Sequence, residues 1–319
     1  MQKFLVFIVS CILLISCDKN SEKEAEIEKI PVDFEVIRFD QKFAEATAAS
    51  LPQLKNQYPF LFPEQYPDSL WENKLTDSIQ MELDTAVAKV FPEFSEETDE
   101  FHSLFQHVSY YFPNFRSPDV ITVTSEVDYK NKVIYTGQYL FVSLDTYLGE
   151  DHPFYVGIQD YLKKNFSRDQ IIPDAANAIA ENYLPQPDSR QFISQVVYYG
   201  KLLYLKDLFI PFKTDAEKIG YTEEELDWVQ KNEAQIWRYF IEKELIYDTD
   251  TNLYVRFLFP APFSKFYLAL DSESPSRTGQ YIGWNIVRSY MNKNDVSVEK
   301  MLNTSAEEIF DKAKYKPKK

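Results

Sequence analysis

The hydrophobic pattern of the first folded stretch is typical of a β-strand. Residues 31–40 read "PVDFEVIRFD", and apolar residues occupy every second position from Val32 to Val36. The apolar positions then shift to Ile37 and Phe39. This shift indicates either a bulge or a segment that is buried on both faces.

Two further stretches are typical of strands, and the region before them is mainly helical. Residues 119–127 and 132–148 are rich in β-branched and aromatic residues, which predicts a hairpin or two adjacent strands. Residues 41–115 are broken by prolines but include one clear amphipathic helix. Its apolar positions, which share one helical face, are Phe101, Leu104, Phe105 and Val108.

From Pro153 onward the period of the apolar positions is helical. Thr222 with Glu225 forms a capping box at the start of one helix, and Thr304 with Glu307 predicts another. The predicted helices cover residues 154–164, 168–183, 189–209, 222–246, 279–293 and 305–313. The pattern therefore predicts a single, mainly helical α+β domain with a small β-sheet.

The amino-terminal residues have the pattern of a lipoprotein signal. Lys3 precedes an apolar run over residues 4–15, which is shorter than the roughly 20 residues of a membrane-spanning helix. The run ends in Leu-Ile-Ser-Cys, so that a small Ser16 precedes Cys17 as in a bacterial lipobox. We expect cleavage between Ser16 and Cys17, and attachment of a diacylglyceryl group to the Cys17 thiol. An ordinary secretory signal that contains a cysteine is the alternative.

This signal divides the chain into three parts. Residues 1–16 are the predicted signal peptide, residues 17–30 a flexible tether, and residues 31–319 a globular domain. The tether is polar, carries mixed charge and lacks aromatic residues, so it is not expected to order itself. Several acyl chains on Cys17 would hold the protein in the cell envelope, at about 0.8 kcal/mol per buried CH₂. The expected location is periplasm-facing, on the inner or the outer membrane.

Composition excludes several classes of partner. The chain carries 34 basic and 50 acidic residues, a net charge of −16, which disfavours nucleic acid and leaves membrane attachment to the lipid alone. Only 7 residues are glycine, and no glycine-rich phosphate-binding motif occurs. We expect no cofactor, and no small-molecule substrate is identified. The aromatic content of 16% indicates mostly core residues, with a sugar- or peptide-stacking surface as the alternative.

Candidate catalytic and metal-binding residues are scarce. The chain has three histidines and no H-E-x-x-H motif, and His102 and His107 are five residues apart, so they do not share a helical face. His152 lies in "GEDHPFY", where capping a turn is the expected role. No G-x-S-x-G motif occurs, and Cys17 is the last cysteine. We predict no metal site and no catalytic residue.

Two glycines stand where helices are predicted. Gly200 and Gly283 each cost a helix about 1 kcal/mol relative to alanine, which indicates that another backbone approaches closely. Nearby, Arg277 and Trp284 are candidates to line a cleft. The preferred alternative for Trp284 is that its ring fills the space that the glycine opens.

The chain resembles the gliding motility lipoprotein GldB family of the Bacteroidota. The stretches that carry the resemblance are "IPVDFEVIRFD", "YYFPNF", "DYKNKVIY", "LGEDHPFY", "YYGKLLYLKDLFIP", "KIGYTEEEL", "NEAQIWRYFIEKELIY", "APFSKFY", "SPSRTGQYIGWNIVRSYM" and "KYKPKK". The resemblance implies an envelope lipoprotein required for gliding over surfaces, with other gliding and envelope proteins as partners and a link to type IX secretion. It implies no catalytic activity, and Cys17 is the one functional position that it maps.

A more distant similarity is to gluzincin peptidases. In those enzymes one helix carries H-E-x-x-H and a second supplies a glutamate. Here "IIPDAANAIAENY" lacks both histidines, and Tyr199 stands where the glutamate would precede Gly200. The similarity implies a zincin-like scaffold that has lost its metal site.

Three functions are compatible with the sequence. The leading one is a non-enzymatic component of the gliding apparatus that works through protein–protein contacts. The second is a peptidoglycan- or glycan-binding module that uses exposed tyrosine and tryptophan. The third is a hydrolase of peptide or peptidoglycan whose unidentified carboxylates lie near residues 198–209 and 274–291.

Overall fold

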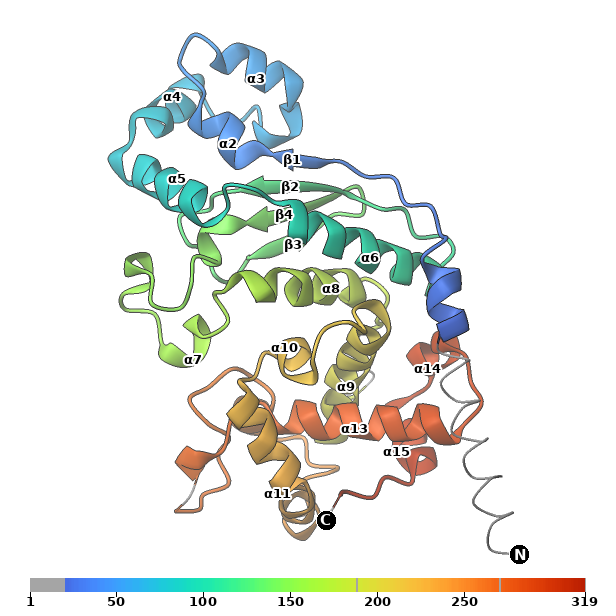
Figure 1. Cartoon of the computed structure of the whole chain (residues 1–319). Helices are drawn as coiled ribbons and strands as arrows, with labels where there is room; N and C mark the ends of the chain where they lie inside the picture. Colours follow the sequence, from blue (N-terminus) through green and yellow to red (C-terminus); the bar gives the residue numbers. More distant parts are fainter. Residues whose placement is uncertain (1–20, 188, 270, 319) are drawn as a thin grey trace, which may run out of the picture.

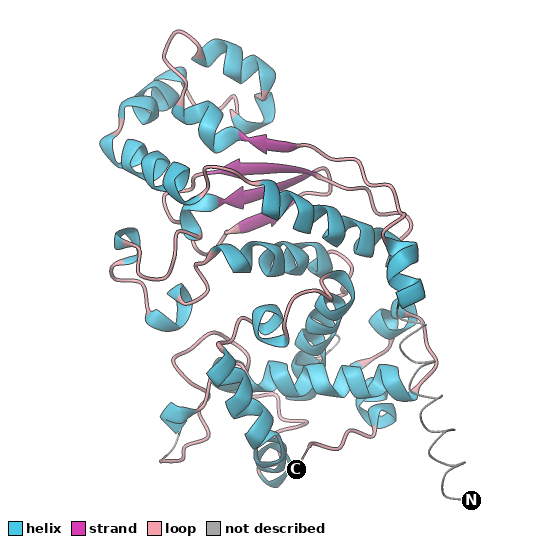
Figure 2. Cartoon of the chain, in the orientation of Figure 1, coloured by secondary structure: helices cyan, strands magenta, loops and turns pink. Residues whose placement is uncertain are grey.

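A small mixed sheet lies between helices in the computed structural model, which describes residues 21–187, 189–269 and 271–318 (Figures 1 and 2). The strands are β1 (Val36–Arg38), β2 (Asp119–Val123), β3 (Val133–Tyr135) and β4 (Tyr139–Ser143). Their order across the sheet is β1-β2-β4-β3. β1, β2 and β4 are parallel, and β3 forms an antiparallel edge hairpin with β4. The predicted adjacent strands are therefore confirmed.

Most of the described residues outside the sheet are helical, which confirms the α+β class (Figure 2). The helices before β2 are α2 (Phe39–Ala44), α3 (Leu51–Gln57), α4 (Asp68–Thr76), α5 (Ser78–Val90) and α6 (Ser95–Tyr111). The helices after β4 are α7 (Asp160–Lys163), α8 (Ile171–Glu181), α9 (Phe192–Phe209), α10 (Asp215–Ile219), α11 (Glu223–Glu242), α12 (Asn252–Phe257), α13 (Thr278–Lys293), α14 (Val298–Asn303) and α15 (Ala306–Ala313). No helix in these ranges is both long and apolar enough to cross a membrane.

The sheet separates two hydrophobic cores. Val120, Leu140 and Val142 point from one face into the main core, which also contains α6 and α8. Ile121 points from the other face into a smaller core. The other buried residues of this core come from α2, from α3 and from the segment that follows α3. They are Phe39, Phe43, Leu51, Tyr58 and Phe62.

The phase shift in residues 31–40 is explained by these two cores. Phe34 and Val36 pack against the main core, whereas Ile37 and Phe39 belong to the smaller one. The interpretation as two-sided burial is therefore confirmed. The predicted strand is shorter than expected, because only Val36–Arg38 pairs with β2 and α2 begins directly afterwards.

The amphipathic helix before β2 is confirmed as α6. Its four predicted apolar positions are fully buried, and the helix ends at Tyr111, just before Pro113. The predicted helix over residues 154–164 is wrong, because the left-handed backbone of Gly157 (φ +91°) interrupts it and only α7 remains.

The capping prediction is half confirmed. Thr222 and Glu225 form the expected capping box at the start of α11. At α15, however, the N-cap is Ser305, whose hydroxyl accepts from the backbone N–H of Glu308. The predicted pair of Thr304 and Glu307 is therefore wrong by one residue.

Residues 21–30 differ from the predicted flexible tether. Residues 21–27 are helical, and Ile27 is buried against the domain. The Gln106 side-chain amide donates to the carbonyls of Glu28 and Ile30 at 2.8 and 3.0 Å. The burial of Ile27 and the hydrogen bonds from Gln106 of α6 thus hold this polar segment against the domain, although its composition does not favour an ordered structure by itself. The rest of the predicted tether, residues 17–20, lies outside the described residues.

The zincin-like scaffold is not supported. On α8, which would carry the metal-binding motif, the inward positions Ala175, Ala176 and Ile179 are fully buried in the apolar core. Throughout the described ranges, no group of three or more histidine, cysteine, aspartate or glutamate side chains is placed to hold a metal ion. His152 has the expected capping role, because its Nδ1 accepts from the backbone N–H of Phe154 at 3.3 Å.

Candidate functional site

The two helical glycines lie at the crossing of α9 and α13. A Cβ on Gly200 would lie 2.3 Å from the carbonyl oxygen of Gly283, and a Cβ on Gly283 would lie 1.9 Å from that of Val196. Neither distance is compatible with any side chain. The predicted close approach of two backbones is therefore confirmed.

Trp284, which follows Gly283 on α13, is buried. Its side chain is fully buried, and its indole N–H donates to Asp207 Oδ2 at 2.8 Å. The Arg288 guanidinium stacks on the indole, 3.6 Å from the ring centre. Trp284 is therefore a packing residue, but the space beside each glycine is taken by the backbone of the facing helix and not by the indole ring.

Arg288 joins α9, α10 and α13 through two carboxylates. Its Nε and Nη2 donate to Asp207 at 2.7 Å, and its Nη1 and Nη2 donate to Asp215 at 2.9 and 2.8 Å. Burial favours the neutral form of Asp215, but the hydrogen bonds and charge of Arg288 outweigh it and hold the pKa of that carboxyl below its usual value. Asp207 also pairs with Lys218 at 3.2 Å. These carboxylates thus hold the helices together.

Arg277 lines a cavity of about 240 Å³ between α8, α9, α10 and α13. Its Nη2 donates to the carbonyl of Gly220 at 2.7 Å. Across the cavity, Lys206 donates from Nζ to the carbonyl of Lys218 at 2.9 Å. Burial lowers the pKa of Lys206 to about 8. Three cationic residues, Lys206, Lys218 and Arg277, thus line the cavity, and only Arg277 among them was a sequence candidate.

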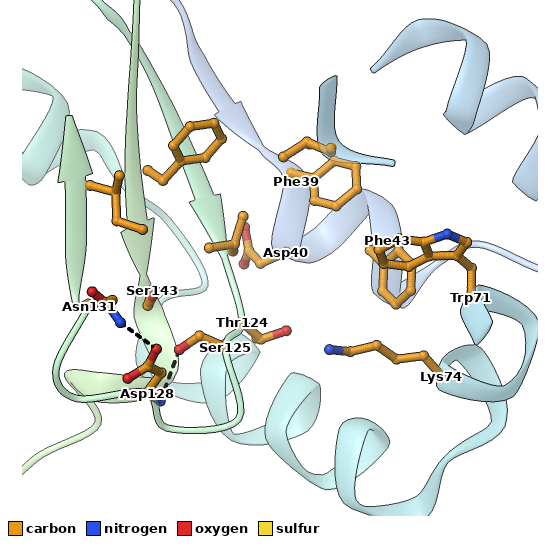
Figure 3. A pocket seen from close by; sticks show the side chains of 14 residues that line it. Phe39, Asp40, Phe43, Trp71, Lys74, Thr124, Ser125, Asp128, Asn131 and Ser143 are labelled. Atoms are coloured by element: carbon orange, nitrogen blue, oxygen red, sulfur yellow. Dashed lines mark hydrogen bonds between the residues drawn. The ribbon is translucent and has the colours of Figure 1, made fainter. Parts of the chain in front are cut away.

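A second cavity, of about 300 Å³, lies at the carboxyl ends of the three parallel strands (Figure 3). Such ends are where open sheets with parallel strands commonly bind ligands. Phe39, Phe43 and Trp71 form one side, and Lys74 extends from α4 toward the opposite loop (Figure 3). The polar residues on the side of the strand ends are Thr124, Ser125, Asp128, Asn131 and Ser143.

The loop that borders this second cavity has an unusual backbone. Glu126 and Val127 both have positive φ angles, of 57° and 60°, which is rare for a β-branched residue such as valine. The fully buried Asp145 holds the loop by accepting from the backbone N–H groups of Ser125 and Val127 at 3.0 and 2.6 Å. Burial raises the pKa of Asp145, although these hydrogen bonds oppose the rise. Strained backbone of this kind is often found where ligands bind.

The predicted site residues thus separate into three places. Gly200, Gly283 and Trp284 pack helices, Arg277 lines the first cavity, and Ser16 and Cys17 lie outside the described residues.

Sequence reasoning missed Lys206 and Asp145. The signal for Lys206 was a lysine in a predominantly apolar helix, and no residue of α9 is exposed. Asp145 had the same kind of signal, an aspartate within the apolar run "FVSLDTYL".

Comparison with known proteins places the chain in one family. The model of the family described as gliding motility protein GldB matches residues 20–317, nearly the whole length. No curated protein matches the chain, and no solved structure does. Since the match covers the sheet, both cores and both cavities, the chain belongs to the GldB family of gliding motility lipoproteins.

Proposed function

We propose that this protein is a membrane-anchored envelope component of the gliding apparatus and that it works through protein–protein contacts rather than catalysis. The observation that carries the proposal is the family match over residues 20–317. It is supported by the lipobox that ends at Cys17. The lipid on Cys17 and the contacts with other motility proteins are the parts that experiment must test.

The structure supports a short distance between anchor and domain. The folded body begins by residue 21, where the helical segment that carries Ile27 packs on the domain. Four Cα steps separate Cys17 from Ser21, and a chain advances at most about 3.6 Å per residue, so they span no more than about 14 Å. A protein held so close to a bilayer suits a role as a membrane-proximal platform for partners.

Replacing Cys17 by alanine is expected to release the protein from membranes and to abolish spreading on surfaces, because the lipid is the proposed anchor. Membrane fractionation and colony spreading measure the two effects. Ser16→Ala is the matched control, since it keeps a small residue at the cleavage site and should leave both unchanged. Normal spreading by Cys17→Ala, at the wild-type protein level, would remove the anchor from the mechanism.

A contact mechanism also predicts partners that stay with the protein in living cells. Cross-linking in vivo, followed by purification and mass spectrometry, should recover other gliding or envelope proteins in defined ratios. Recovery of the monomer alone would contradict the contact mechanism while leaving the anchor untouched.

The cavity in Figure 3 favours envelope glycan binding as a second candidate function, because aromatic rings face hydroxyl, amide and carboxylate groups across it. Purified protein should then sediment with purified sacculi. Trp71→Ala should weaken the binding about 2- to 10-fold, the range of one aromatic contact.

Two further variants make this test specific. Ile134→Ser changes an exposed cavity residue with little risk to folding, and Tyr247→Ala removes an exposed ring away from the cavity. Only the first should weaken sedimentation. Equal binding by all variants would rule out this cavity as a glycan site.

A further inference from the structure

Two cations in the first cavity lack a carboxylate partner. Among the described residues, no aspartate or glutamate oxygen lies within 4.0 Å of a side-chain nitrogen of Lys206 or Arg277. By contrast, Lys132 and Lys218, which lie nearby, pair with Asp174 and Asp207. In a chain with 50 acidic and 34 basic residues, this lack of pairing is unexpected.

Lys206 keeps unused hydrogen-bonding capacity in a buried position. Its side chain projects from the last turn of α9, and the residue is 7% exposed. The ammonium group has three donors, and the carbonyl of Lys218 takes one of them. Burying an ammonium group costs free energy, and burial lowers the pKa of Lys206 to about 8, although the charges of Asp174 and Glu181 oppose the fall. An anion in the cavity would offset that cost.

Arg277 has unused capacity as well. It lies at the N-cap of α13 in a left-handed conformation (φ +61°), and its Nη2 donates to Gly220. Its Nε is buried and has no hydrogen-bond partner within the described ranges. A guanidinium group with an unpaired N–H can bind a carboxylate or a phosphate.

The other residues that line this cavity, together with its volume, limit which ligands can bind there. Leu258, Phe259 and Pro260 add an apolar wall, and Asn177 and Gln280 add amides that can donate or accept. Asp174 and the exposed Glu181 add two carboxylates, and Lys218 adds a third cation. A volume of about 240 Å³ is below the roughly 300–1,000 Å³ of sites for drug-sized ligands. The occupant must be small.

We propose that this cavity binds a carboxylate-bearing ligand of amino-acid size, such as the carboxyl-terminal residue of a short peptide. The carboxylate lies against Lys206 and Arg277, and the apolar side chain contacts the wall at Leu258. The site is independent of the lipid anchor, so its failure would leave the proposed function intact.

The test uses the full-length lipoprotein, purified in detergent, and titration calorimetry with alanine, trialanine, trialanine amide and inorganic phosphate. Alanine or trialanine should bind, and the amide should bind at least about 10-fold more weakly, because it lacks the anionic group that both cations need. Binding of acid and amide with equal affinity, or of phosphate alone, would overturn the assignment. So would the absence of any binding at millimolar ligand.

Matched variants test the residues. Lys206→Met keeps the length of the side chain, and Arg277→Gln keeps N–H donors but removes the charge. Each should weaken binding at least about 10-fold, the value of one charge-assisted hydrogen bond. Lys231→Met removes an exposed charge on α11, outside the cavity, and should leave the affinity unchanged. Thermal unfolding of each variant separates lost binding from lost folding. Unchanged affinity in both cavity variants would overturn the proposal.

Discussion

Replacing Gly283 by alanine is expected to destabilise the protein by several kcal/mol. In a solvent-exposed helix the same change would stabilise the protein by about 1 kcal/mol. The sign of the change in unfolding free energy therefore distinguishes a close helix crossing from an exposed position. At Gly283 the added methyl group would lie 1.9 Å from the carbonyl oxygen of Val196, and backbone atoms of α9 cannot move aside as a side chain can. The two helices must separate, which opens space around the buried Trp284.

Chemical denaturation of a series of variants measures this effect. Gly200→Ala should be similarly severe, because its new methyl group meets the backbone of Gly283 at 2.3 Å. Gly279→Ala should be milder, because its closest contacts, with Leu258 and Phe257, are at 2.9 Å. Asn292→Ala, on the exposed face of α13, is the control and should change stability by less than about 0.5 kcal/mol. An unchanged midpoint for Gly283→Ala would refute the close crossing.

Replacing Arg288 by methionine is expected to cost on the order of 3 kcal/mol. The change removes four hydrogen bonds and the cation stacked on Trp284, and it leaves Asp207 with Lys218 as its one remaining ion-pair partner. Breaking a buried ion pair typically costs 3–5 kcal/mol, and the lower end applies because Asp215 is about one-third exposed. Arg238→Met, an exposed arginine on α11, is the control and should be nearly neutral.

The pH dependence gives this prediction a second readout. The pKa of Asp215 is depressed in the folded protein, so its contribution to stability is present above the unfolded value near 3.8 and is lost as pH falls through the folded value. Wild-type protein should therefore lose stability as the pH falls below about 4, and Arg288→Met should lose less. Parallel stability curves for the two proteins over this range would contradict the role of Arg288.

Local patterns were sufficient where the deciding contacts lie within one element. The buried face of α6 follows from its 3.6-residue period, and the capping box of α11 follows from the spacing of Thr222 and Glu225. Gly200 and Gly283 indicated that another backbone approaches closely, because glycine destabilises a helix unless a larger residue cannot fit. The sequence did not show, however, that the two glycines meet each other.

The sequence by itself thus determined the α+β class, the faces of the long helices and the stretches that carry the family resemblance. Tertiary structure alone decided the parallel pairing of β1, β2 and β4, the second core, the ordering of residues 21–27, and the convergence of Lys206 with Arg277. The physical reason is the separation along the chain between the residues that interact. Periodicity and capping depend on neighbours a few residues apart, whereas strand partners and the charges around a buried lysine come from segments tens of residues away, and only packing brings these together.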